Sequence, residues 1–157
     1  MTIGKDLRRY YIKEMFADHL ERLKIIGIWL NGFEGEGEFK RWHKNGQLCL
    51  HSSCKNGKRD GEYKYWYENG KLCERCYYRN GKKNGEYRNW YNNGQLYCHC
   101  YYKNHKRDGE LEKWHENGQP WEHCYYKDGM LDGEYKRWYD SGRLDIHCYY
   151  KNGVKIK

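Results

Sequence analysis

The sequence repeats itself every 24 residues, and no insertion or deletion interrupts the series. Each unit opens with a Gly-Glu pair, and a Trp follows the Gly by five positions. The glycines are Gly37, Gly61, Gly85, Gly109 and Gly133, and the tryptophans are Trp42, Trp66, Trp90, Trp114 and Trp138. A fixed period of this length indicates a row of similar structural units, each of which packs mainly against its neighbours.

Each unit also contains two turn signals, because Asn-Gly supplies the positive φ angles that tight hairpin turns require. The first signals are Asn45-Gly46, Asn69-Gly70, Asn93-Gly94, Asn117-Gly118 and Ser141-Gly142. The second are Asn56-Gly57, Asn80-Gly81, Asn104-His105, Asp128-Gly129 and Asn152-Gly153. The runs between turns, such as Gly61 to Tyr67 and Leu72 to Arg79, are short and rich in aromatic residues, which favours strands. Each repeat is therefore predicted to be one antiparallel hairpin.

Aliphatic side chains are too scarce to form an ordinary core, so order has to come from 18 Tyr and 7 Trp, which bury large apolar areas. We predict an all-β fold in which residues 37–157 form an elongated, single-layer antiparallel sheet of stacked hairpins. Residues 1–36 are predicted to be a cap, made of an amphipathic helix and a degenerate half repeat. The apolar stripe of that helix consists of Leu7, Tyr11, Met15, Leu20 and Leu23.

The repeat unit resembles a known family. The segment Gly61 to Leu72 is similar to the MORN repeat, and the turn at Tyr150 to Gly153 is similar to its slightly longer variant. The match covers residues 37–153 in five units. The second strand, as in His147 to Asn152, resembles repeats that large DNA viruses encode in many copies. The resemblance implies an elongated sheet used for scaffolding, self-association or partner docking, and it carries over no catalytic residue.

Strand alternation divides the side chains between two faces. In the first strand of the second unit, Tyr63 and Tyr65 share one face, whereas Glu62 and Lys64 share the other. In its second strand, alternation places Leu72, Cys76 and Tyr78 on one side and Cys73, Arg75 and Tyr77 on the other. Both faces therefore carry aromatic residues, and the sequence leaves open whether bulges near the Gly-Glu pair rotate some of these columns.

Three columns of equivalent side chains are candidates for structural or binding roles. The Trp column and the column of Cys76, Cys100, Cys124 and Cys148 are interpreted as packing that holds the array together. Tyr and His are amphipathic enough to stay exposed and still bind a partner. The candidate partner surface therefore consists of Tyr77, Tyr101, Tyr125, Tyr149, His99, His123 and His147.

Metal binding and catalysis are not expected. Neighbouring His and Cys residues point to opposite faces of a strand, and equivalent positions in successive units lie roughly 9 to 10 Å apart. Cys73-x-x-Cys76 and Cys98-x-Cys100 are single motifs without the second pair that makes a zinc site convincing. A single-layer sheet offers no deep pocket, and no acid and base converge. We predict no metal, no cofactor and no enzymatic activity.

The net charge of +8 comes from 30 basic and 22 acidic residues that alternate along the chain, a pattern typical of a solvated surface. No apolar segment reads as an export signal or a transmembrane span. Eight Cys without an export signal suggest a reducing compartment. We expect a location in the host cytoplasm or in a virus particle, and no secretion.

The leading hypothesis is a structural or scaffolding protein that binds other proteins along an extended aromatic face, as a virion or minor capsid-associated component. One alternative is binding of nucleic acid or acidic lipid, motivated by the charge and by aromatic rings that stack on bases. Another is neutralisation of a toxin partner, which similar bacterial repeats suggest. Leu144 to Tyr150 is predicted to be an edge strand and a route to self-association, unless Val154 to Lys157 covers it.

Overall fold

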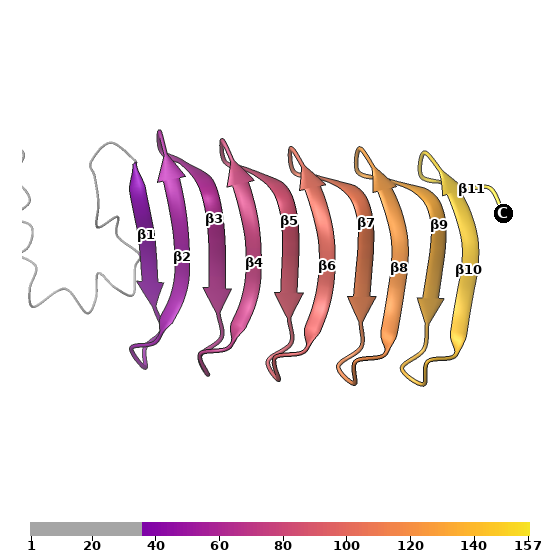
Figure 1. The fold of residues 1–157 in the computed structure, drawn as a ribbon, viewed down its shortest axis with the longest axis horizontal. Helices are drawn as coiled ribbons and strands as arrows, with labels where there is room; N and C mark the ends of the chain where they lie inside the picture. The colour runs from indigo at the N-terminus through magenta and orange to yellow at the C-terminus, as the bar shows by residue number, and fades with distance from the viewer. Residues whose placement is uncertain (1–35) are drawn as a thin grey trace, which may run out of the picture.

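The computed structural model describes residues 36–157 as one antiparallel sheet of eleven strands, whose spatial order follows the sequence (Figure 1). The strands are β1 (Gly37–Trp42), β2 (Leu48–Lys55), β3 (Lys58–Trp66), β4 (Leu72–Arg79), β5 (Lys82–Trp90), β6 (Leu96–Lys103), β7 (Lys106–Trp114), β8 (Pro120–Lys127), β9 (Met130–Trp138), β10 (Leu144–Lys151) and β11 (Val154–Lys155). The predicted all-β stack of hairpins is confirmed. The helix and half repeat predicted for residues 1–36 lie outside the described residues, apart from Glu36.

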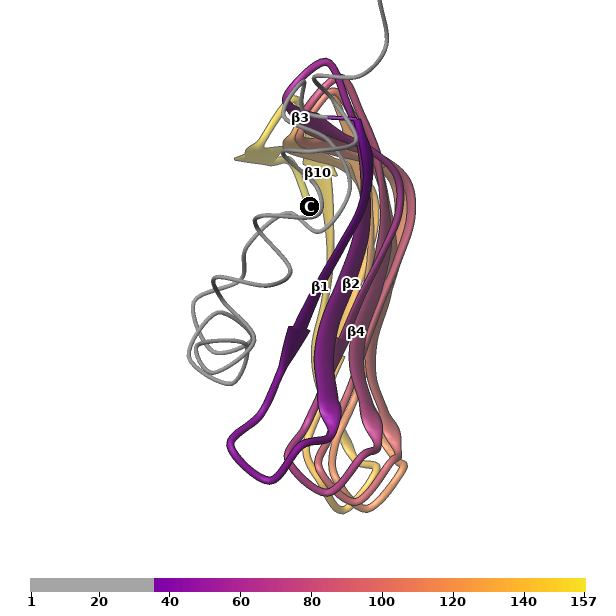
Figure 2. The same ribbon diagram turned by 90° about the vertical axis from the view of Figure 1, so that its left-hand side faces the viewer.

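The described strands form a single layer, which bends along the length of the strands (Figure 2). In the second to fifth repeats the first strand is longer than the sequence suggested; β3, for example, begins at Lys58 and not at Gly61. The tight turns follow the prediction: Asn56 and Gly57 both have positive φ, at 49° and 69°. His105 adopts the same conformation, with φ of 70°, in the place where other units have Gly.

Bulges between the strands decide which columns of side chains share a face, which strand alternation in the sequence left open. Between β4 and β5, Cys76 pairs with Tyr87 and Tyr78 pairs with Lys83, so that three residues around Gly85 lie opposite Tyr77. Gly85 has a φ of 109°, which L side chains rarely adopt. In the second to fifth repeats, the Gly of the Gly-Glu pair is therefore required by a bulge within a long strand.

The second bulge corrects the predicted faces of Leu72 and Cys73. Trp66 pairs with Leu72 while Tyr65 pairs with Glu74, which leaves Cys73 as the extra residue. Directly paired residues share a face, so Leu72 lies on the face of Trp66 and not on that of Cys76. Simple alternation is wrong here because the extra residue at the bulge shifts the residues that precede it in the strand to the opposite face.

One face, which we call the cysteine face, is the buried side of the sheet. Its floor consists of Cys76, Cys100, Cys124 and Cys148, all 0–3% exposed. Tyrosine rings and long basic side chains cover these thiols. Lys83 Nζ lies 4.3 Å from the centroid of the Tyr87 ring and 3.0 Å from Glu74 Oε1. Arg107 lies over the ring of Tyr126 in the same way, 5.3 Å from its centroid. The sheet thus builds an interior from its own side chains without a second layer.

A second set of contacts joins each repeat to the next at the turns that follow the first strand of each repeat, as between β3 and β4. These turns lie at the bottom of Figure 1, and we call them the lower turns. The Tyr67 hydroxyl donates to the Trp90 carbonyl at 2.6 Å, and Tyr91 does the same to Trp114 at 2.9 Å. Asn69 Nδ2 donates to the carbonyl of Asn92 at 3.2 Å. In the last unit, where no further repeat follows in the described chain, Ser141 stands at the position of this Asn.

The final strand covers part of the predicted edge. Lys151 pairs with Val154, the Tyr149 amide donates to the Lys157 carbonyl at 3.0 Å, and the Ile156 amide donates to the Tyr149 carbonyl at 2.9 Å. Within residues 36–157, no strand pairs with the outer side of Leu144 to Cys148. The edge is therefore blunted at one end only.

Substitution of Gly133 by Ala is expected to destabilise the sheet because φ is 127° and the added Cβ would lie 3.3 Å from the Tyr125 Cβ. Gly46→Ala is the control, since φ is 84° but nothing lies within 4 Å. Backbone strain alone costs about 1–2 kcal/mol. We expect Gly133→Ala to lose more than Gly46→Ala in urea denaturation. Equal losses would contradict a role for the contact with Tyr125.

Candidate partner-binding face

The face opposite the cysteine face brings the predicted Tyr and His residues together. We call it the histidine face; its members are Tyr77, Tyr101, Tyr125 and Tyr149 with Arg75, His99, His123 and His147 on even-numbered strands, and Glu62, Glu86, Glu110 and Glu134 on odd-numbered strands. In each repeat the Glu pairs directly with the Tyr across the strands, as Glu110 does with Tyr125. The same three positions therefore meet in every repeat from the second to the fifth.

The fourth repeat shows the geometry of one such group. His123 Nε2 lies 2.7 Å from Glu110 Oε1, and the Tyr125 hydroxyl donates to the same oxygen at 3.3 Å. The rings of His123 and Tyr125 meet edge to face, with centroids 5.1 Å apart. In the fifth repeat the corresponding distances from Glu134 are 2.9 Å to His147 and 3.3 Å to Tyr149. A single carboxylate thus orients two rings.

Electrostatics strengthens this arrangement. The hydrogen bond with His123 lowers the pKa of Glu110 below its usual value, so the carboxylate is ionised at neutral pH. The negative charge of Glu110 in turn raises the pKa of Tyr125, which keeps its hydroxyl protonated as a donor. The ring of Tyr125 is consequently held in place, while 38% of the residue's surface stays accessible to a partner.

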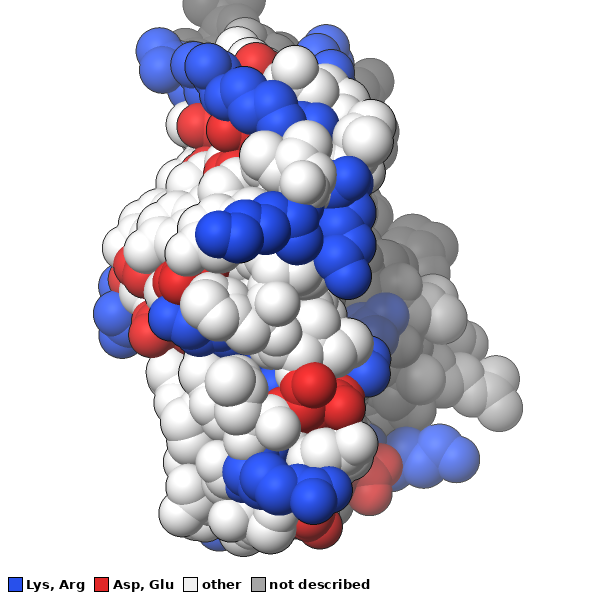
Figure 3. Space-filling view, turned by 90° about the vertical axis from the view of Figure 1, so that its right-hand side faces the viewer, with Lys and Arg blue, Asp and Glu red and all other residues white. Residues whose placement is uncertain are grey.

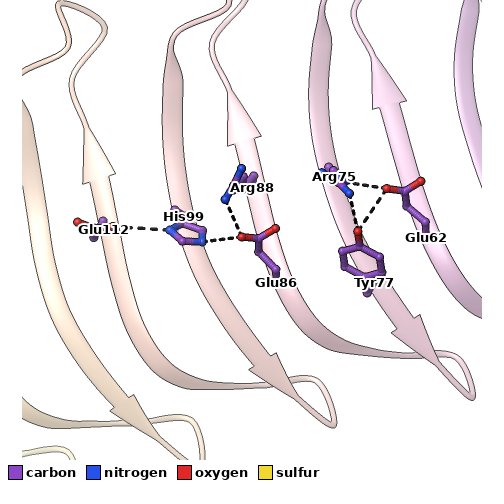
Figure 4. Close-up of polar contacts among 7 residues, drawn as sticks. All are labelled: Glu62, Arg75, Tyr77, Glu86, Arg88, His99 and Glu112. Atoms are coloured by element: carbon purple, nitrogen blue, oxygen red, sulfur yellow. Dashed lines mark hydrogen bonds and ion pairs between the residues drawn. The ribbon is translucent and has the colours of Figure 1, made fainter.

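In the second and third repeats, the contacts of the Glu differ from those in the fourth and fifth repeats (Figure 4). Arg75 takes the place of His: its Nε lies 2.7 Å from Glu62 Oε1, and its terminal nitrogen donates to the Tyr77 hydroxyl at 2.5 Å. In the third repeat, His99 Nε2 lies 3.1 Å from Glu86 Oε1. On its other side, His99 Nδ1 lies 3.6 Å from Glu112 Oε2 in the next repeat, so polar contacts continue from one repeat to the next.

Glu112 is a departure from the repeat that sequence reasoning missed. Equivalent positions hold a cation that pairs with the Glu two residues earlier; these are Lys40, Lys64, Arg88 and Lys136. In the fourth repeat both positions are acidic, as Glu110 and Glu112. The sequence signal for Glu112 is a reversal of charge within an otherwise regular column. The sequence signal for the partner-facing Glu is its presence in every Gly-Glu pair.

Three of the four predicted tyrosines are exposed. Tyr101, Tyr125 and Tyr149 are 40%, 38% and 36% accessible, whereas Tyr77 is half-buried beside Arg75, whose guanidinium lies 5.5 Å from its ring centroid. Each exposed ring stands at the same position in its repeat. The geometry therefore offers a row of regularly spaced aromatic rings from β6 to β10.

The cysteine column lies on the other face and is chemically protected. Burial raises the pKa of Cys76 and of Cys124 to about 12. Cys98 and Cys100 share this face, and the hydrogen bond between their thiols lowers the pKa of Cys98 and raises that of Cys100. All eight Cys are free thiols. Among residues 36–157, no group of three or more His, Cys, Asp or Glu is placed to hold a metal ion.

The charged side chains are interspersed over the surface. Seen from the C-terminal end, Lys and Arg lie in separate groups with acidic and uncharged surface between them (Figure 3). On the histidine face the cations at Lys64, Arg88 and Lys136 are each 2.7–2.9 Å from a Glu. The part of the chain that the structure describes contains no helix long and apolar enough to span a membrane.

Iodoacetamide labelling at pH 8 is expected to separate the thiols, because the thiolate is the reactive form and burial excludes the reagent. Cys73 is only half-buried and should react first, whereas Cys76 and Cys124 should react slowly in the native protein. Mass spectrometry of peptides measures the rates, and urea-unfolded protein, in which all eight thiols react, is the control. Native Cys76 labelled as fast as Cys73 would contradict the packing described above.

The five repeats match a known family. The family model described as the MORN repeat variant matches five segments, residues 35–56, 59–80, 83–104, 107–128 and 131–152. These segments follow one another at the 24-residue step of the sequence and together cover more than half of the chain. No curated protein matches the chain at a significant level.

Proposed function

The chain belongs to the MORN repeat variant family, and from that premise we propose that it is a non-enzymatic scaffold that docks a partner protein along its histidine face. Repeats of this family are commonly involved in interactions with proteins or membrane lipids. The fold supports a docking role because a long, single-layer array presents the same side chains many times. Such repetition suits an extended partner better than a small substrate.

The observation that carries the proposal is the row of Tyr101, Tyr125 and Tyr149, exposed yet held in position. Exposed tyrosines are common anchors at protein interfaces because they offer a large contact area with a polar tip. The hydrogen bonds from Tyr125 and Tyr149 to Glu110 and Glu134 restrict these side chains before any partner arrives. Less conformational entropy is then lost on binding.

Binding of nucleic acid or acidic lipid is the alternative of a different class, and the net charge of +8 motivates it. The histidine face does not favour it, because the cations there are paired with Glu and the fourth repeat is acidic. A scaffolding role inside a virus particle is a narrower form of our proposal. It rests only on the resemblance of the second strand, as in His147 to Asn152, to repeats that large DNA viruses encode.

Affinity capture of the tagged protein at two salt concentrations, followed by mass spectrometry, tests the proposal. Proteins that stay bound at the higher salt support docking through a specific surface. Nucleic acid or lipid that is lost at the higher salt would favour the electrostatic alternative, since such binding weakens steeply with salt. Capture from purified particles tests the virion form of the proposal.

The double variant Tyr101→Ala/Tyr125→Ala should bind a captured partner at least tenfold more weakly, because each ring supplies contact area that Ala lacks. Tyr139→Ala is the matched control: Tyr139 is also an exposed tyrosine, at 44%, but lies at a lower turn outside the Tyr column. Surface plasmon resonance measures the affinities. Equal losses in the two proteins would contradict docking on the histidine face.

A second copy of the chain is a further partner that we propose, for the open edge of β10. The outer side of Leu144 to Cys148 has unpaired backbone among the described residues, and unpaired edges recruit strands. The tail pairs with Tyr149 and Lys151 and limits the length of this edge.

Deletion of residues 151–157 is expected to raise the oligomer fraction, because it exposes the rest of the β10 edge. Sedimentation velocity over a concentration series measures the change. The control is a chain of full length in which Lys155 and Lys157 are replaced by Ala, which keeps the tail while removing its charge. An unchanged oligomer fraction after deletion would show that the tail does not protect the edge.

A further inference from the structure

The spacing of the exposed tyrosines is set by the sheet. Tyr101, Tyr125 and Tyr149 occupy equivalent positions on β6, β8 and β10, which alternate with β7 and β9 in the sheet (Figure 1). Neighbouring strands are about 4.7–4.9 Å apart, so successive rings are two strand spacings, or about 9.6 Å, apart. A partner that uses all three rings must present matching groups at this interval.

A polyproline II helix has this interval. It makes one turn in three residues with a rise of 3.1 Å per residue, so every third side chain returns to the same side after about 9.3 Å. The mismatch is about 0.3 Å per turn and accumulates to about 0.6 Å over three rings. Proline rings are known to dock against aromatic side chains in this conformation. An extended β-strand, by contrast, repeats its faces about every 6.8 Å and would fall out of step.

The bulge glycines let two of the exposed tyrosines pack closely on the sheet. A Cβ added to Gly109 would lie 3.7 Å from the Tyr101 Cβ, and one added to Gly133 would lie 3.3 Å from the Tyr125 Cβ. Each tyrosine therefore fills the space that a side chain at the glycine would need. The inner side of the ring packs on the bulge, and its exposed side remains available to a proline ring.

Charge adds a second requirement for the partner. On β7, Glu110 lies between the positions of Tyr101 and Tyr125, and Glu112, two residues farther along, lies between His99 and His123. The side chains of Glu110 and Glu112 are 45% and 40% exposed. The cation found at the position of Glu112 in the other repeats is missing here. This stretch of the histidine face therefore attracts a positively charged group from a partner.

We propose that the histidine face binds a proline-rich segment of a partner protein in the polyproline II conformation, with a proline at every third residue and a Lys or Arg between the first two. The prolines lie on Tyr101, Tyr125 and Tyr149, and the basic residue lies against Glu112. Such a segment is already extended before it binds, so little ordering entropy is lost. The inference rests on the docking function proposed above and names the chemistry of the partner.

Fluorescence anisotropy with labelled synthetic peptides tests the spacing. The probe is a nine-residue peptide with Pro-Ala-Arg repeated three times, and the control has the same composition with its three prolines adjacent. We expect the repeated peptide to bind at least tenfold more tightly, and Tyr101→Ala/Tyr125→Ala to weaken it at least tenfold. Equal affinity for the two peptides, or no saturable binding at millimolar concentration, would overturn the proposal.

The charge requirement is tested with Glu112→Lys, which introduces the type of residue that equivalent positions already carry and so should preserve the fold. This variant should lose at least fivefold in affinity for the Arg-containing peptide and nothing for a Pro-Ala-Gln version. Glu116→Lys is the control, because it makes the same change in net charge at a lower turn, outside the histidine face. Equal losses in the two variants would refute a specific contact at Glu112.

The outcomes separate this inference from the broader proposal. If captured partners depend on Tyr101 and Tyr125 while the proline peptides do not bind, the docking function stands and the polyproline inference fails. If the double Tyr variant still captures every partner, both fail. If an oligonucleotide or vesicles of acidic lipid compete with the repeated peptide at low salt and not at high salt, the contact is electrostatic and the inference also fails.

Discussion

The burial of a small thiol in every repeat from the second to the fifth is the packing on which the sheet depends. A single-layer sheet has no second layer to cover it, so its interior has to come from its own side chains. Cys76, Cys100 and Cys124 are 0–1% exposed because they are small enough for tyrosine rings and basic side chains to lie across them. Lys83 illustrates the cover, since it contacts the Tyr87 ring and also pairs with Glu74. Burial keeps the pKa of these thiols high, which suits a structural role over a reactive one.

Because these thiols are buried on the cysteine face, the histidine face remains available for binding. Buried thiols and tyrosine rings pack on the cysteine face, while the Glu, His and Tyr side chains of the histidine face are held by polar contacts such as those of Glu110 with His123 and Tyr125. Polar contacts orient side chains without covering them, so exposed rings remain available. The bulge glycines also make room on the histidine face, because Gly133 lacks the Cβ that would lie 3.3 Å from the Tyr125 Cβ.

Three departures from the repeat change local contacts or charge. Ser141 stands at the position of the turn Asn, which in the fourth repeat, as Asn117, donates to the Asp140 carbonyl. His105 takes a conformation usually reserved for Gly, and its Nδ1 accepts a hydrogen bond from the Lys83 amide at 3.1 Å. Glu112 reverses the charge of its column and makes the fourth repeat different from the others. Such differences distinguish individual repeats within a nearly uniform array.

The sequence by itself determined the hairpins, their turns and their order, because a fixed period and Asn-Gly turn chemistry are local signals that need no distant contact. It also placed Tyr101 beside His99, since strand alternation is local. Tertiary structure alone decided the faces of Leu72 and Cys73, because a bulge is defined by how a strand pairs with its neighbour. It also decided that Glu110 holds both His123 and Tyr125, a contact across strands that no spacing within one strand reveals.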